Sequence, residues 1–197
     1  MKSSKILSKV FVSGVLLLGA GFSSCEDFLT VLSTDKITED DFWKNSSDLN
    51  NVRSAAYKQM TSDAVTGRIL YWGELRSDNL AQNDMTKTDI ELLRKGVLHP
   101  TDAMFDWAAF YTGINYCNKV LEKGEAMTIP GQEVDPSFRR GDWLPIKVEM
   151  LSVRALYYFY LVRAYRNVPF VTKSVSTDAE AMRSKIGATN GVDILGN

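Results

Sequence analysis

The feature that most constrains the fold of this chain is a long apolar run with helical spacing at residues 145–166. Apolar side chains recur there at every third or fourth position, which places them on one face of a helix. The stripe consists of Ile146, Met150, Val153, Tyr157, Tyr160 and Ala164. Pro145 suits a first helical turn, and Pro169 disfavours helix in the residue before it. We therefore expect a helix over 145–166, with Tyr157 and Tyr160 buried.

A second long stripe precedes this one, at residues 102–123. Gly124 is expected to end that helix, because glycine is common just after a helical C-terminus. Prolines and glycines at 124–143 then predict a long loop between the two helices. The helices are offset by more residues than a tetratricopeptide unit contains. Repeat-like stacking is therefore compatible with the spacing but is not established by it.

The N-terminal half carries shorter helical signals. Thr38 and Asp41 have the spacing of a capping box, which predicts a turn at 39–44 and a helix near 47–61. Residues 76–100 are polar and predict a loop. Long runs of strand alternation are absent from the sequence. The fold class is therefore predicted to be all-α, built from antiparallel helix pairs with long inserted loops.

The first residues predict the compartment. Three lysines precede an apolar run at 10–22, which is shorter than the roughly 20 residues that a bilayer-spanning helix needs. The run ends in small residues and Cys25, as in a lipoprotein signal. We expect 1–24 to be a signal peptide, Cys25 to be lipidated, and 25–37 to be a tether. An ordinary secretory signal with a nearby cysteine is the alternative.

The sequence lacks the common catalytic and metal-binding patterns. His99 is the only histidine, which excludes a zinc site built on several histidines. Cys117 is expected to be a small core residue, because it lies on an apolar helical stripe. The net charge of −1 lacks the basic excess of a nucleic-acid surface. We expect no catalytic residue, no metal and no cofactor, although a pair of glycosidase carboxylates cannot be recognised from sequence alone.

Aromatic side chains are the residues best suited to stacking on sugar rings. At helical spacing they are more often core residues, which is our expectation for Trp107, Tyr157 and Tyr160. Trp72 lies in a less regular element, so both interpretations stay open there. Trp143, within the predicted loop, is the other candidate platform for glycan, together with Phe138.

Several motifs in order resemble the SusD-like (RagB/SusD) outer-membrane lipoproteins. The resemblance begins at Cys25 and continues through three further segments, at 38–43, 72–79 and 107–121. It is closest at 153–159, where Val-Arg-Ala-Leu-Tyr-Tyr-Phe is similar to the family's Leu-Arg-Ala-Leu-Tyr-Tyr-Phe helix. That helix leads into Asn167-Val168-Pro169, where the family usually has Gly-Asp-Val-Pro. Arg166 therefore stands at the position of the usual glycine.

The resemblance implies a scaffold of tetratricopeptide-like helix pairs, anchored in the outer membrane and facing the cell exterior. It implies a non-catalytic protein that captures oligo- or polysaccharide for nutrient uptake during polysaccharide utilisation. The implied partners are a SusC-like TonB-dependent transporter, the glycan, and the bilayer through Cys25, with no nucleic acid.

Family members are usually far longer, and their glycan-contacting loops lie largely beyond the first helices. We therefore expect 38–171 to be the N-terminal helical domain and 172–197 to begin an incomplete following region, as in a truncated protein. No sugar-binding residue can be carried over from the family. A helical scaffold that only docks to the transporter is the alternative function.

Overall fold

The computed structural model describes residues 39–75, 77, 79–81, 83, 88–97, 99, 101–131, 134–177, 180 and 186–196. All of them belong to one compact unit, Thr38–Asn197. The predicted signal peptide, the tether and Cys25 lie outside the described residues. Within the described part of the chain, no helix combines the length and the apolar character needed to cross a membrane.

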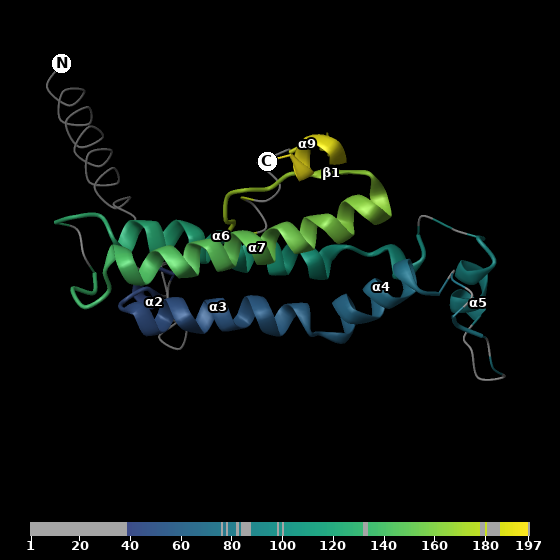
Figure 1. Cartoon of the computed structure of the whole chain (residues 1–197), viewed down its shortest axis with the longest axis horizontal. Coiled ribbons are helices and arrows are strands. Elements are labelled where there is room, and N and C mark those ends of the chain that lie inside the picture. Colours follow the sequence, from purple (N-terminus) through teal and green to yellow (C-terminus); the bar gives the residue numbers. More distant parts are fainter. Residues whose placement is uncertain are drawn as a thin grey trace, which may run out of the picture. The chain divides into compact units, whose positions relative to one another are not determined.

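Helices dominate the structure, which confirms the all-α prediction (Figure 1). In chain order the helical elements are α2 (Glu39–Phe42), α3 (Ser46–Met60), α4 (Asp63–Gly73), α5 (Thr88–Arg94), the 3-10 helix η2 (Ala103–Phe105), α6 (Ala108–Met127), α7 (Arg140–Tyr165) and α9 (Gly191–Leu195). Two strands, β1 (Asn167–Pro169) and β2 (Ala188–Asn190), pair antiparallel with Val168 opposite Thr189. The expected turn at 39–44 and helix near 47–61 correspond to α2 and α3.

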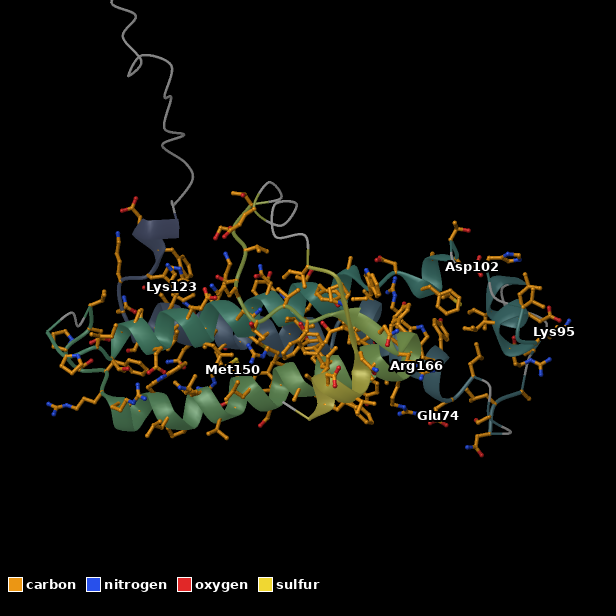
Figure 2. The ribbon with its side chains drawn as sticks, turned by 90° about the horizontal axis from the view of Figure 1, so that it is seen from above. Glu74, Lys95, Asp102, Lys123, Met150 and Arg166 are labelled. Carbon is orange, nitrogen blue, oxygen red and sulfur yellow. The ribbon has the colours of Figure 1, made fainter. Side chains whose placement is uncertain are left out.

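The core lies between three long helices, α3, α6 and α7, which are side by side in Figure 1. Helix α6 packs against both of the others. The loop at 128–139 joins neighbouring ends of α6 and α7, so these two helices run antiparallel. Figure 2 shows Met150 among the side chains of this core, where it is fully buried. Arg53 of α3 and Glu149 of α7 form an ion pair of 2.7 Å across the helices.

The inner stripe of α7 follows the predicted spacing over most of its length. Its buried members at three- and four-residue steps are Trp143, Ile146, Met150, Val153, Tyr157 and Leu161. The prediction was wrong at the end of the stripe, because Tyr160 is only half-buried and Ala164 is exposed. A four-residue step from Tyr157 leads to Leu161, so Tyr160 turns toward the edge of the helix pair.

Both long helices differ from their predicted bounds at the loop between them. Helix α6 continues through Gly124 to Met127, and α7 begins at Arg140, ahead of Pro145. Gly124 is buried and faces the indole of Trp143. Its missing side chain therefore serves helix packing and not helix termination. The Asp142 carboxylate accepts a hydrogen bond from the Arg139 backbone N–H at 3.0 Å and caps the start of α7.

The start of α6 also differs from the prediction, since the helix begins at Ala108 and not at 102. Residues 103–105 form the 3-10 helix η2, and Asp106 is extended, with a ψ of 120°. The Asp106 side chain accepts a hydrogen bond from the Ala108 N–H at 2.9 Å. An aspartate that bonds two residues ahead favours a turn over a continued helix.

The segment after α7 returns along α6 and α7 and is held by buried polar side chains. The Tyr158 hydroxyl donates to the Val171 carbonyl at 2.9 Å and accepts from the Val171 N–H at 2.7 Å. Asn118, which is fully buried, donates to the carbonyls of Val171 and Lys173. The Asn115 amide forms two hydrogen bonds with the Val175 backbone, both of 2.9 Å. These contacts order a segment that its own polar composition predicts only as a tail.

The turn between α7 and β1 places Arg166 in a strained conformation. Its φ is +63°, the single positive φ of a non-glycine residue among those described. Side chains rarely adopt this region, because the Cβ atom approaches the backbone. Glycine, which the SusD-like resemblance has at this position, adopts it freely. Arg166 is labelled in Figure 2, at the end of α7.

Candidate functional site

A shallow pocket of about 300 Å³ lies between α4 and the C-terminal part of α7. It is lined by Thr66, Ile69, Leu70, Trp72, Gly73, Glu74, Tyr160, Arg163 and Ala164. The volume is at the lower end of the range for small-molecule sites. Figure 2 shows Glu74 near the end of α4 and Arg166 at the end of α7, the two helix ends that border the pocket.

The indole of Trp72 is fixed by three neighbours. It stacks on Phe110 with a centroid distance of 5.0 Å and an interplanar angle of 21°, and its edge meets Tyr165 at 5.4 Å. Its Nε1–H donates to the Met104 carbonyl at 3.0 Å. These contacts orient the ring while leaving part of it in the pocket, since Trp72 is only half-buried. A rigid, partly exposed aromatic ring is a typical platform for a sugar.

Polar groups surround that ring. Arg163 is exposed, and its guanidinium lies 5.4 Å from the Phe159 ring centroid, which positions the charge beside the pocket. The half-buried Tyr160 and the exposed Glu74 complete the polar lining. The pocket thus combines one fixed aromatic ring with a guanidinium, a phenol and a carboxylate. Such a set can stack on a sugar ring and hydrogen-bond its hydroxyls.

Trp143, the second candidate platform, does not reach the surface. Its side chain is fully buried against Gly124, and its Nε1–H donates to Glu125 at 3.0 Å. Phe138 is also buried, at 6% exposure. An aromatic ring without an exposed face cannot stack on a glycan, so this candidate was wrong. The cause is that Trp143 belongs to the first turn of α7, which extends into the predicted loop.

Glu125 is the electrostatic centre of the α6–α7 junction. Its carboxylate pairs with Arg140, accepts from Trp143, and pairs with Lys147 at 2.9 Å. These contacts, with Arg140 the strongest, lower the pKa of Glu125 to about 2. The cluster is structural: it binds the end of α6 to the start of α7. Sequence reasoning missed it because the three partners of Glu125 are 15 to 22 residues away.

The remaining sequence candidates have structural positions. His99 is exposed in a loop, and Cys117 is buried in the core as expected. Burial raises the pKa of the Cys117 thiol to about 12, so it is a poor nucleophile. Across the described ranges, no three histidine, cysteine, aspartate or glutamate residues are grouped to hold a metal ion.

Comparison with known proteins gives the family. The SusD-like family described as starch-binding and associating with the outer membrane matches residues 27–190. SusD-like protein P38 of Formosa agariphila is 29% identical over 199 residues, which cover 99% of this chain and 36% of that protein. The chain thus spans about a third of the length of this curated relative. No solved structure shows significant similarity to the chain. The match over 27–190 shows that the chain belongs to the SusD-like family.

Proposed function

We propose that this chain is part of a lipid-anchored protein that captures glycan at the outer membrane and presents it to a TonB-dependent transporter. Membership of a family described as starch-binding and outer-membrane-associated supports the glycan and the location. The structural observation that supports glycan contact is the Trp72 pocket. It is the place where a fixed aromatic ring and several polar groups meet at the surface.

The proposed role is binding without bond cleavage. Glycoside hydrolysis normally uses two carboxylic acids on either side of the scissile bond. Glu74 is the one carboxylate among the residues that line the pocket. Trp72, Tyr160 and Arg163 supply stacking and hydrogen bonds but no second acid. The arrangement therefore favours recognition of a sugar over its hydrolysis.

One aromatic ring in a shallow pocket supports only weak affinity. We expect residues 26–197 to bind a matching oligosaccharide with a Kd in about the millimolar range, or not measurably, by titration calorimetry. Arg163→Ala should weaken any binding, because it removes a donor at the pocket rim. Lys173→Ala, which removes an exposed cation from the return segment, is the matched control. Tight binding that is unaffected by Arg163→Ala would place the glycan site elsewhere in the chain.

A helical scaffold that docks to the transporter without contacting glycan is the second candidate. The burial of Trp143 and Phe138 favours it, because it leaves few exposed aromatic rings for sugar. Co-purification with a SusC-like transporter, combined with no binding to a panel of polysaccharides, would support this role. Binding to one polysaccharide that depends on Arg163 would exclude it.

Anchoring through Cys25 is part of the proposal. A bacterial lipoprotein carries several acyl chains, which stable membrane attachment requires. Cys25→Ser should therefore release the protein from membranes or leave the signal uncleaved. Metabolic labelling with a fatty acid measures this directly: label that persists in the Cys25→Ser variant would exclude Cys25 as the site. Cys117→Ser is the control and should keep the label, since Cys117 is buried in the core.

A further inference from the structure

The outward face of α7 carries a second apolar stripe, opposite the one that forms the core. Its members Leu144, Val148, Leu151 and Phe159 are 46%, 63%, 38% and 41% exposed. Together with the exposed Ala155 they recur at three- and four-residue steps, the spacing of a helix–helix seam. At 1.5 Å per residue the stripe extends about 22 Å along the helix. We call these five residues the outer seam.

The outer seam opens into a groove of about 400 Å³ beside α9. Val148 and Leu151 form one wall, and Phe170, Ile194 and Leu195 form the other. Leu195 is 54% exposed and extends the apolar surface beyond the groove. Apolar surface that is contiguous over this length is uncommon on a free monomer and marks a contact surface.

A cation lies in the same groove. Arg154 is half-buried and lines the groove, and its guanidinium donates to the Asn118 side chain at 2.8 Å. Burial lowers the pKa of Arg154. Among the residues that the structure describes, no carboxylate pairs with it. A partly desolvated arginine without an acid favours a ligand that supplies one.

We propose that the outer seam and the Arg154 groove bind a further helix of the same SusD-like polypeptide, one that is apolar on one face and carries a carboxylate opposite Arg154. The length of the stripe fits a helix, whereas a small apolar ligand would fill the groove and leave Leu144 and Phe159 uncovered. The relative of known length supports the source, because this chain spans only 36% of SusD-like protein P38.

Charge argues against a second copy of this chain as the occupant. In a twofold pairing, the same surface of each copy meets its counterpart. Two outer seams would then bring two Arg154 guanidinium groups toward each other near the middle of the interface. Like charges that are partly desolvated oppose association. A helix with an acid at that position has no such conflict.

The test combines residues 26–197 with the part of SusD-like protein P38 that lies outside the matched 36%, expressed as a separate chain. We expect a 1:1 complex on size exclusion with light scattering. Leu151→Asp should disrupt it, because the substitution puts a charge in the seam. Val134→Asp is the matched control: Val134 is 53% exposed and lies in the α6–α7 loop, so the complex should persist.

Arg154 tests the charge. Arg154→Gln should weaken the complex about tenfold, whereas Arg154→Lys should retain most of the affinity. Circular dichroism of each variant alone checks that helix content is unchanged, so that loss of the complex reports the surface and not unfolding. Absence of a 1:1 complex would overturn the proposal. So would a complex that tolerates Leu151→Asp, or a homodimer of residues 26–197 that Leu151→Asp dissociates.

Discussion

The hydroxyl of Tyr157, in the middle of α7, donates a hydrogen bond to the carbonyl of Ala56 in α3 at 3.0 Å. The two residues are 101 positions apart in the sequence, and both are buried. The Tyr157 ring also lies against Gly113 of α6. One side chain therefore contacts all three helices of the core.

Tyr157→Ala should destabilise the fold by about 3–5 kcal/mol, because it leaves a large cavity between α3, α6 and α7. Tyr157→Phe keeps the ring and loses only the hydrogen bond, so it should cost about 0.5–1.5 kcal/mol. Urea denaturation followed by circular dichroism measures both. Phe159→Ala is the control and should cost much less, since Phe159 is 41% exposed. Equal effects of Tyr157→Ala and Phe159→Ala would contradict the placement of Tyr157.

Gly124→Ala should destabilise the fold by about 1–3 kcal/mol. A Cβ atom at Gly124 would overlap the ring of Trp143, which is fully buried and cannot turn away. Gly141→Ala is the matched control, because Gly141 also lies in a helix but has no neighbouring atom within 4 Å of such a Cβ. It should stabilise the protein, by up to about 1 kcal/mol. A stabilising Gly124→Ala would show that the two helices are further apart than described.

Arg166→Gly should stabilise the protein by about 1 kcal/mol, since glycine adopts a φ of +63° without strain. The midpoint of urea unfolding should rise while its slope stays constant. Arg163→Gly is the control with the same change of residue type. It lies inside α7, where glycine should destabilise by about 1 kcal/mol. If both substitutions destabilise, the turn after α7 does not have the positive φ.

The stability of the protein should depend on pH through Glu125. The pKa of Glu125 is lowered to about 2, so its contribution is present above its ordinary pKa of 4.5 and is lost as the pH falls toward 2. The effect should be modest, because the side chain is 42% exposed. Arg140→Gln should raise the pKa of Glu125, as measured by carboxyl NMR titration. Arg139→Gln, at the neighbouring arginine, should leave it low.

The positions of the long helices could be predicted from the sequence because their apolar residues repeat with the helical period. Met150, Val153 and Tyr157 are buried as that period requires. The bounds could not be predicted, because they depend on partners far along the chain. Gly124 has the sequence signature of a helix end, but the Trp143 ring makes it a packing position. Arg140 begins α7 early because Asp142 caps the helix and Glu125 pairs with Arg140.

The candidate site was only half predictable. Trp72 and Trp143 have equally plausible sequence contexts, yet one is half-buried beside a pocket and the other is fully buried. Their difference arises from tertiary packing: Phe110 covers one face of Trp72, whereas Trp143 is enclosed at the α6–α7 junction. The period of α7 assigns Tyr160 to the core, but the step to Leu161 moves it to the rim of the pocket.

The hydrogen bonds from Tyr158 and Asn118 to the backbone of Val171 separate the path of the chain after α7 from its local sequence. Backbone carbonyls and N–H groups are common to nearly all residues, so this route is encoded in α6 and α7. The side chains at 172–174 are then free to diverge between homologues without changing the route. A mutational scan should accordingly show high tolerance at Thr172 and Lys173, both exposed, and low tolerance at Asn118. A stretch that varies freely in sequence can thus be fixed in space, and sequence variability there is no measure of disorder.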